Sequence, residues 1–292
     1  MSLTSISFIV FLAIIFLLYY TVFRKKQWVI LLIGSIVFLV LSCSEPYVLL
    51  YVLYGFLVTY FGAILIDKCQ NEKKRKIVRT VFIILALLTL LVLKYTNLFG
   101  VTIEFISKLF SGDFSWDMLY FLVPVGISYY TIISIGYLID VYRKTYEPQK
   151  NPFKYLLFMI FFPQMTSGPF NRYQDMQEKL YSEHKFEFKN FTLGILRITW
   201  GFFKVLVISE SMGTICNTIY QDLDTYTGFY ILVAACFYTI QLYSNFSGCI
   251  DIALGTSKLF DIKMPENFDG PFFSKTMSEF WRRWHITLRY MV

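Results

Sequence analysis

The sequence is short of charge and of histidine. Only 16% of its 292 residues are Asp, Glu, Lys or Arg, whereas soluble domains average about 25% charged residues. There are two histidines, and 56% of the residues are hydrophobic. A water-soluble fold of this length could not bury so much apolar surface, so the composition excludes an ordinary soluble enzyme and indicates a membrane protein.

Paired cysteines are also missing. The chain has an odd number of cysteines, five, and none of them stand in a CxxC or CxxxC spacing. Three of the five lie within apolar runs. The sequence therefore predicts neither a disulfide framework nor a zinc site, and we expect no bound metal and no bound cofactor.

Long uncharged runs are present instead. A membrane-spanning helix needs roughly 20 mostly apolar residues. Five runs meet this length, namely residues 1–23, 27–44, 46–66, 118–139 and 225–250, and weaker runs lie at 77–93 and 191–208. The last of these contains Arg197 and Lys204, which must face protein, water or headgroups. We predict one all-α transmembrane domain over residues 1–292, with roughly 7–9 membrane helices in contact with lipid.

Basic loops suggest how the chain is oriented. The first run lacks the flanks of a cleaved signal peptide and is followed by Arg24, Lys25 and Lys26, which predicts a cytoplasmic anchor and an N-terminus outside the cell membrane. A second basic cluster, residues 68–76, fits the same positive-inside pattern, although an anionic lipid or nucleic acid could also attract it. The net charge of +7 requires no further partner, and we predict no nucleic acid.

One apolar segment, residues 155–171, contains Pro163, Gly168 and Pro169. The predicted topology places both of its ends on the cytoplasmic side, so we expect a re-entrant segment. Such a segment is tolerated only where protein or water meets its open backbone groups.

A polar stripe continues the apolar run at 225–250. At helical spacing Gln241, Ser244, Asn245 and Gly248 share one face, and Asp251 lies close to it. Such a stripe either joins two helices or lines a wet cavity. A carboxylate at membrane depth costs roughly 2.5–3.5 kcal/mol unless it is paired or hydrated, which favours a cavity slightly.

The most unusual segment is the helix predicted over residues 278–288. On one face it carries Trp281, Trp284, His285 and Leu288. Tryptophan and arginine are typical of membrane interfaces, so a plain interfacial helix is one interpretation. The other is a chemical role for the imidazole, whose pKa near neutrality suits a base.

Ser278 is the expected N-cap of this helix, with Ser274 and Thr276 as alternatives. The second histidine, His184, lies in a hydrophilic loop, where a chemical role is less expected than for His285.

Three blocks of sequence together resemble the membrane-bound O-acyltransferases, in particular the bacterial branch that acts in alginate O-acetylation and teichoic-acid D-alanylation. The blocks occupy residues 123–288 in the order of that family. They are VPVGISYYT with YLIDVYR at 123–143, FFPQMTSGPF at 161–170, and a third that runs from FSG at 246 through PENF at 265 to EFWRRWHITL at 279–288.

The resemblance implies a polytopic fold with a central tunnel and the transfer of an acyl group, acetyl being expected, to hydroxyls of an extracytoplasmic polysaccharide. It implies a donor such as acyl-CoA or an acyl-carrier thioester, and an acyl-carrier or accessory acyltransferase protein as partner. His285 matches the first of two family histidines and is the expected catalytic residue. The residues expected to line the tunnel or meet substrate are Asn245, Asp251, Trp284, Arg282 and Arg283.

The chain also departs from the family pattern. Asn245 stands where the family often has an acid, and Cys249 and Ile250 replace a common Tyr-Ser pair. The second of the two family histidines, which is not His184, would lie beyond Val292. We therefore expect a C-terminally truncated, incomplete form of the fold. An inactive remnant and a polytopic transporter or channel are the alternative functions.

Overall fold

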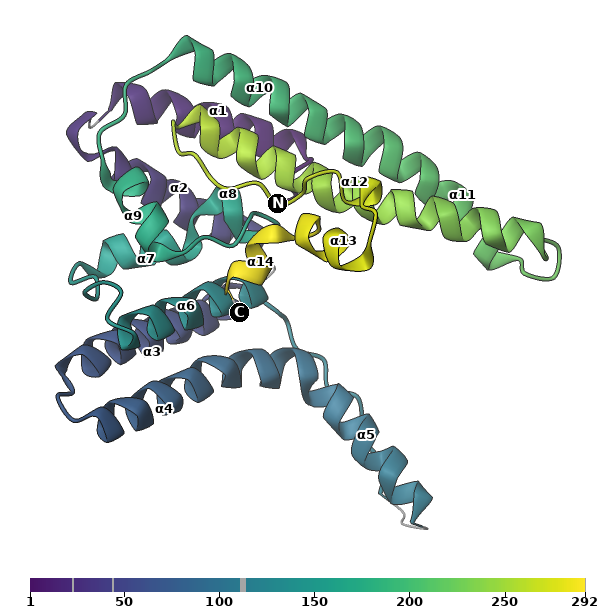
Figure 1. Ribbon diagram of the computed structural model, residues 1–292, viewed down its shortest axis with the longest axis horizontal. Coiled ribbons are helices and arrows are strands. Elements are labelled where there is room, and N and C mark those ends of the chain that lie inside the picture. The colour runs from purple at the N-terminus through teal and green to yellow at the C-terminus, as the bar shows by residue number, and fades with distance from the viewer. Residues whose placement is uncertain (23, 44, 111–113, 292) are drawn as a thin grey trace. The chain divides into compact units, whose positions relative to one another are not determined.

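The structure is a computed structural model that describes residues 1–22, 24–43, 45–110 and 114–291 (Figure 1). Its secondary structure is helical. Among the described residues no β-strand occurs, and the isolated antiparallel bridge between Phe268 and Trp284 joins two loop segments. The all-α, polytopic class predicted from the composition is confirmed.

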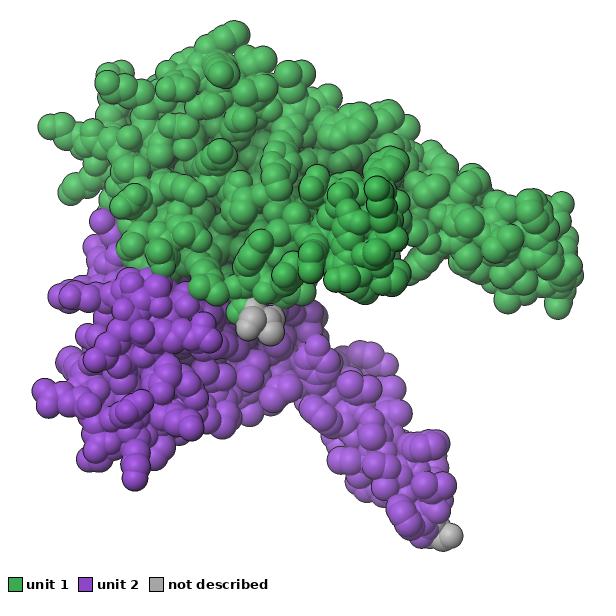
Figure 2. All heavy atoms as spheres, viewed as in Figure 1, with its two compact units in different colours: residues 1–35, 161–292 green, residues 36–160 purple. Residues whose placement is uncertain are grey.

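The contacts within the chain fall into two compact units (Figure 2). Unit 1 contains residues 1–35 and 161–292, and unit 2 contains residues 36–160. Helix α2 (Gln27–Ser42) crosses the first boundary. Unit 2 holds α3 (Leu49–Lys68), α4 (Glu72–Leu90), α5 (Thr96–Leu109), α6 (Ile127–Tyr142) and α7 (Pro152–Ile160). Unit 1 holds α1 (Ile6–Thr21), α8 (Phe162–Met165), α9 (Tyr173–Tyr181), α10 (Phe188–Phe202), α11 (Glu210–Gln221), α12 (Phe229–Leu259), α13 (Met277–Arg283) and α14 (Ile286–Met291).

Five helical stretches of the described chain are long and apolar enough to cross a membrane: Arg24–Ser42, Pro46–Lys68, Glu72–Leu109, Phe188–Gln221 and Phe229–Leu259. Both runs with weaker signals, 77–93 and 191–208, lie inside these stretches. They extend further than expected because π-helical turns, Leu91–Tyr95 and Phe203–Ser209, join α4 to α5 and α10 to α11 without a break. In contrast, α1 has only 16 residues, or about 24 Å of helix, which is short of a 30 Å bilayer core.

The expected span at 118–139 is wrong at its beginning. Residues 115–124 are not helical, and α6 begins only at Ile127, after Pro124 and after Gly126 with its left-handed φ of 77°. The non-helical segment lies along α5, where the Asn97 amide donates to the carbonyl oxygen of Leu119 at 2.6 Å and accepts from its N–H at 2.9 Å. The polar Asn97 thus satisfies an extended backbone that apolarity alone assigned to a helix.

The segment 155–171, with its Pro163, Gly168 and Pro169, is not one continuous helix: α7 ends at Ile160, α8 spans Phe162–Met165, and residues 166–172 are not helical. In unit 1 the N–H of Phe162 donates to the Ser35 hydroxyl at 3.1 Å, which satisfies one of the free N–H groups at the start of α8. The side from which this segment enters the membrane stays a prediction.

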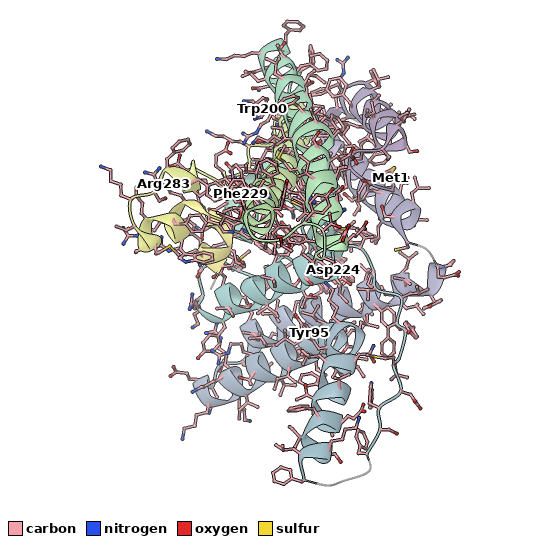
Figure 3. The ribbon with its side chains drawn as sticks, turned by 90° about the vertical axis from the view of Figure 1, so that its right-hand side faces the viewer. Met1, Tyr95, Trp200, Asp224, Phe229 and Arg283 are labelled. Atoms are coloured by element: carbon pink, nitrogen blue, oxygen red, sulfur yellow. The ribbon has the colours of Figure 1, made fainter. Side chains whose placement is uncertain are left out.

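In unit 1, α10 and α12 run side by side (Figure 1). Glycines at matching seven-residue spacing let their backbones touch: a Cβ on Gly201 would lie 2.7 Å from the carbonyl oxygen of Gly248, and one on Gly255 would lie 2.8 Å from that of Gly194. Small residues at a membrane helix contact are the known route to such close approach. Gly248 of the polar stripe therefore joins two helices. Figure 3 marks Trp200 on α10, and Asp224 and Phe229 where the chain turns from α11 into α12.

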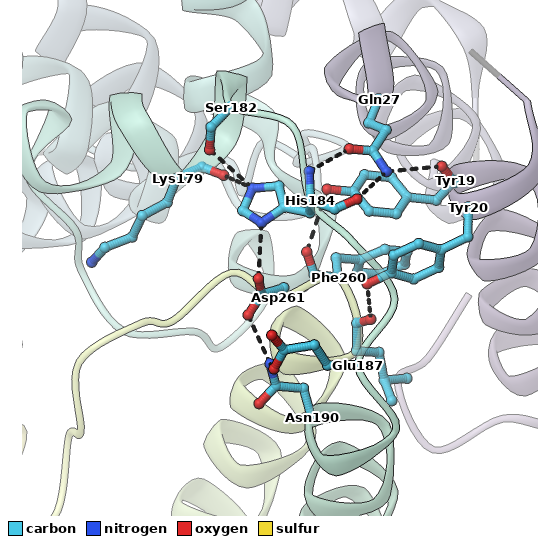
Figure 4. A network of polar contacts seen from close by, with 11 residues as sticks. Tyr19, Tyr20, Gln27, Lys179, Ser182, His184, Glu187, Asn190, Phe260 and Asp261 are labelled. Carbon is cyan, nitrogen blue, oxygen red and sulfur yellow. Dashed lines mark hydrogen bonds and ion pairs between the residues drawn. The ribbon is translucent and has the colours of Figure 1, made fainter. Parts of the chain in front are cut away.

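A polar network fastens the end of α12 to the first helices of the chain (Figure 4). The ring of His184 contacts Asp261 through Nδ1 at 3.2 Å and donates from Nε2 to the carbonyl oxygen of Lys179 at 2.7 Å. The Gln27 amide accepts from the N–H of His184 at 2.7 Å and donates to its carbonyl oxygen at 2.9 Å. Asn190 donates to the other oxygen of Asp261 at 2.8 Å. This network fixes the point from which the chain leaves α12.

The glycine contact gives a direct prediction. Gly201→Ala should lower stability by about 1–3 kcal/mol, because its Cβ meets a backbone oxygen that cannot move without separating α10 from α12. Thermal unfolding in detergent measures this loss. The matched control is Gly55→Ala on α3, whose Cβ would meet other side chains at an ordinary 3.6 Å. Equal melting temperatures for the two variants would contradict the close packing.

Candidate functional site

The segment that carries His285 is folded differently from the prediction. Thr276, the alternative cap, begins α13: its hydroxyl accepts from the N–H of Glu279 at 3.1 Å, and the Glu279 carboxylate accepts from the N–H of Lys275 at 2.8 Å. This reciprocal arrangement resembles a capping box. The expected cap, Ser278, lies inside the helix.

The expected single helix over 278–288 is also wrong, because α13 ends at Arg283 and α14 begins at Ile286. Between them Trp284 is extended and His285 has a left-handed φ of 48°. That conformation costs a non-glycine residue about 1–3 kcal/mol and persists only where surrounding contacts enforce it. The predicted shared face of Trp281, Trp284, His285 and Leu288 therefore does not exist.

Residues 267–269 supply those enforcing contacts. The N–H of Ile286 donates to the carbonyl oxygen of Asn267 at 3.0 Å, and the N–H of Asp269 donates to that of Arg283 at 3.1 Å. These bonds flank the antiparallel bridge between Phe268 and Trp284. A helix that continued through Trp284 would lose this pairing, so the loop after α12 decides where α13 stops.

The ring of His285 is half-buried between aromatic side chains. Phe170 stacks on it with ring centres 5.6 Å apart and planes within 13°, and Phe246 of α12 meets it edge-on at 5.0 Å. Nδ1 lies 3.3 Å from Oδ1 of Asn267. Burial lowers the pKa of His285 from its usual value of 6.5. The ring is thus neutral near pH 7, as a proton acceptor requires.

Asn267 is fully buried and holds several groups together. Its Oδ1 accepts from the N–H of Thr287 at 3.0 Å and from the Thr287 hydroxyl at 2.6 Å, besides facing His285. That hydroxyl in turn accepts from the N–H of Phe170 at 2.9 Å. The segments around residues 267 and 287 therefore meet at this amide oxygen, and the segment around residue 170 joins them through the Thr287 hydroxyl.

An ion cluster holds the Asn267 segment against the long helices. Asp251 on α12 accepts from Arg197 Nε at 3.0 Å and from Lys204 Nζ at 2.6 Å. Arg197 also donates from Nη1 to Glu266, at 2.6 Å, which immediately precedes Asn267. The charges of the two cations and the two carboxylates cancel. The expectation that Arg197 and Lys204 face protein, water or headgroups is confirmed, because both pair with protein carboxylates.

The other predicted residues lie in varied surroundings. Trp284 packs among aromatic rings, with Phe268 at 5.1 Å and Phe280 stacked at 5.5 Å. Arg283, marked in Figure 3, pairs with Glu279 at 2.7 Å one helical turn away. Arg282 and Asn245 are exposed. Only Trp284 and His285 come together at one place, and the tunnel-lining roles of the predicted residues stay predictions.

Comparison with known proteins matches residues 149–290 to the model of MBOAT, the membrane-bound O-acyltransferase family. Residues 149–290 are therefore an MBOAT domain. It is 35% identical over 196 residues to the protein named alginate O-acetylase AlgI of Azotobacter vinelandii, covering 67% of the chain and 38% of that protein. It is 27% identical to the peptidoglycan O-acetyltransferase of Helicobacter pylori, covering 93% of the chain and 52% of that protein. It is 30% identical to the teichoic acid D-alanyltransferase of Bacillus subtilis, covering 57% of the chain and 42% of that protein. The chain thus spans about two fifths to one half of the length of these relatives.

The matched O-acyltransferase region contains every contact of His285 described above. It also contains a cavity of about 750 Å³, which Phe170 and Thr287 line together with Arg172, Lys179 and Lys263. Space that a ligand could enter therefore borders the residues that hold the imidazole. No group of three or more metal-ligating side chains occurs in the described part of the chain.

Several residues of this site escaped the sequence interpretation. Asn267, Phe170 and Thr287 all lie within the family blocks of the sequence, but the sequence assigns none of them a role. One signal was available: Arg197 and Lys204 stand seven residues apart in an apolar run, two helical turns on one face, and require an acid nearby. Asp251 was the intramembrane acid that the sequence offered.

The lowered pKa of His285 predicts a titration below pH 6.5 for this ring. The unfolded chain then binds the proton at a higher pH than the folded chain, so this contribution to stability is present above pH 6.5 and is lost as the pH falls through the folded pKa. NMR of ring carbons in a His184→Gln background, where His285 is the remaining histidine, measures the midpoint. A midpoint at or above 6.5 would contradict the burial of the ring, and His285→Gln should lack this part of the pH dependence.

The ion cluster predicts a large effect for its buried acid. Asp251→Asn leaves Lys204 without a carboxylate at low dielectric and should cost about 3–5 kcal/mol of stability. Glu266→Gln is the matched control. Because the Glu266 side chain is 57% exposed, water can solvate the partner it leaves behind, and we expect the variant to lose only about 0–1 kcal/mol of stability. Adding Lys204→Met to Asp251→Asn should recover part of the loss. Unfolding in detergent compares the variants, and an Asp251→Asn protein as stable as the control would refute the cluster's role.

Proposed function

We propose that the chain carries out membrane O-acyl transfer: it moves an acyl group, acetyl in the first instance, to a hydroxyl of a cell-envelope polymer. The names of the relatives support the class, since two are O-acetyl transferring proteins and the third transfers D-alanine. Alginate, peptidoglycan and teichoic acid share hydroxyl groups as acceptors. An extracytoplasmic polysaccharide is the proposed acceptor, and the cell membrane, with the N-terminus outside, is the proposed location.

The observation that carries the proposal is the environment of His285. The ring is half-buried and its pKa is lowered, and Phe170, which stacks on it, lines a cavity. In the proposed step the acceptor hydroxyl attacks the carbonyl carbon of an acyl thioester. The ester C–O bond forms, the C–S bond breaks, and the hydroxyl proton ends on the leaving thiolate. His285 accepts a hydrogen bond from the hydroxyl and assists this movement of the proton.

The donor is proposed to be acyl-CoA or an acyl-carrier thioester, delivered with the help of an acyl-carrier or accessory acyltransferase protein. Arg282 is exposed, and Arg283 is engaged by Glu279, so Arg282 has the freer guanidinium for attracting an anionic donor. Exclusion of water by the aromatic residues around His285 would protect the thioester from hydrolysis.

The transporter alternative loses its main support. It is based on the apolar composition and on Asp251 as an intramembrane carboxylate, yet Asp251 accepts hydrogen bonds from both Arg197 and Lys204. A carboxylate with two cationic partners has a structural explanation that needs no transported ion.

An acyl-transfer assay tests the proposal. Vesicles containing the protein receive a radiolabelled acetyl thioester and an unacetylated polysaccharide, and labelled ester is counted over time. His285→Ala should lower kcat at least about 100-fold, which is the lower range for an acid–base group.

The matched control is His184→Gln, which removes the other imidazole of the chain while glutamine can still donate to Asp261. Its rate should equal that of the unsubstituted protein. The proposal fails if His285→Ala transfers acetyl groups at the normal rate, or if the unsubstituted protein transfers none from either donor class.

A further inference from the structure

The amide of Asn267 has a defined orientation. Its acceptor atom is the oxygen, because the N–H of Thr287 that points to it at 3.0 Å can only donate. The Thr287 hydroxyl already accepts from the N–H of Phe170, so its own proton is directed to the same oxygen at 2.6 Å. The atom that faces His285 Nδ1 is therefore a hydrogen-bond acceptor.

An acceptor beside Nδ1 determines where the neutral imidazole carries its proton. A neutral ring has one N–H and one lone pair, and the hydrogen bond made by one nitrogen sets the state of the other. With Asn267 Oδ1 at 3.3 Å, the proton belongs on Nδ1 and the lone pair on Nε2. Free neutral imidazole side chains favour the opposite arrangement, with the proton on Nε2, so the protein must impose this one.

We propose that Asn267 is a positioning residue that holds the proton of His285 on Nδ1 and leaves Nε2 free to accept from the acceptor hydroxyl. This inference rests on the proposed function and names the nitrogen that performs it. When the hydroxyl proton moves toward Nε2, the growing positive charge of the ring is stabilised through Nδ1–H by the same amide oxygen.

The backbone supports this assignment. His285 lies between two residues, Trp284 and Ile286, that are both joined to the Asn267 segment, and its own φ of 48° leaves little freedom. Stacking of Phe170 on the ring resists rotation about the Cβ–Cγ bond, which would turn Nδ1 away from Asn267 and put a ring carbon in its place. Asn267 thus contacts the histidine through both its main chain and its side chain.

The ion cluster extends the same arrangement into the membrane helices. Glu266, next to Asn267, is bound by Arg197, which also binds Asp251 on α12. The Arg197–Glu266 contact, which water screens, thus helps to hold the loop that carries Asn267 near α10 and α12.

Nitrogen-15 NMR of the whole protein in detergent tests the assignment, with labelled histidine in the His184→Gln background at pH 8. Directly protonated and unprotonated ring nitrogens give well-separated signals. The protein with Asn267 should show Nδ1 protonated and Nε2 unprotonated. A ring that is protonated on Nε2, or an equal mixture of the two forms, would overturn the proposal.

Three variants separate positioning from general stabilisation. Asn267→Leu keeps the approximate size and removes the acceptor, so the ring should revert to the form protonated on Nε2. Asn267→Asp retains an acceptor and should keep the proton on Nδ1 while raising the pKa of His285. Thr287→Val is the matched control: it removes a neighbour of Asn267 but leaves its oxygen facing Nδ1, and the proton should stay there. Unchanged ring signals in Asn267→Leu would overturn the proposal, and if that variant does not fold, loss of the Nδ1 proton in Asn267→Asp would do so.

Kinetics give an independent readout. Asn267→Leu should reduce kcat about 10- to 100-fold, the range for removing the partner that orients a functional histidine, while KM changes little. Asn267→Asp should restore most of kcat. If the NMR result holds but no acyl transfer occurs, the proposed function fails and the assignment of the proton stands. If transfer depends on His285 but the ring is protonated on Nε2, only the role of Asn267 fails.

Discussion

The pairing of the buried Asp251 on α12 with Arg197 and Lys204 is the constraint on which the site depends. Arg197 also reaches Glu266, in the loop that follows α12. A lone carboxylate or guanidinium at membrane depth is costly, so Asp251 and Arg197 have a strong reason to stay together, whereas the contact with the exposed Glu266 is screened by water. The glycine contact between α10 and α12 brings Arg197 within reach of Asp251. Helix packing and charge pairing therefore act together to place the segment 266–268.

Hydrogen bonds connect the segment 266–268 to the chain around His285. Asn267 and Phe268 pair with the chain around Trp284, which stops α13 and gives His285 its left-handed backbone. Phe170 and Phe246 then enclose the ring from two sides. The result is a neutral, fixed imidazole whose neighbours Phe170 and Thr287 line a cavity, in a family named for O-acyl transfer. Strain in the backbone of a single residue is the expected cost of such positioning.

The sequence predicted the class of fold, because that depends on composition, and the family blocks singled out His285, whose catalytic role stays a prediction. It could not predict how residues 278–288 fold. The apolar periodicity predicted one helix, whereas pairing of Trp284 with Phe268, sixteen residues earlier, ended that helix before Trp284. The span at 118–139 failed for a similar reason, since the Asn97 side chain satisfies an extended backbone that lies beside α5. In both cases a polar contact distant in sequence outweighed a local apolar pattern. The pairing of Asp251 could not be predicted from local sequence either, because the partners that neutralise it, Lys204 and Arg197, lie 47 and 54 residues away.

A cryo-EM structure of the protein with a bound acceptor oligosaccharide would test the central claim most directly, since that claim concerns which atom meets the reacting hydroxyl. We predict a sugar hydroxyl oxygen within about 3.2 Å of His285 Nε2, the distance at which a proton can be exchanged. Asn267 should still occupy the other side of the ring. An acceptor seated elsewhere, or one whose hydroxyl approaches Nδ1 in place of Asn267, would contradict it.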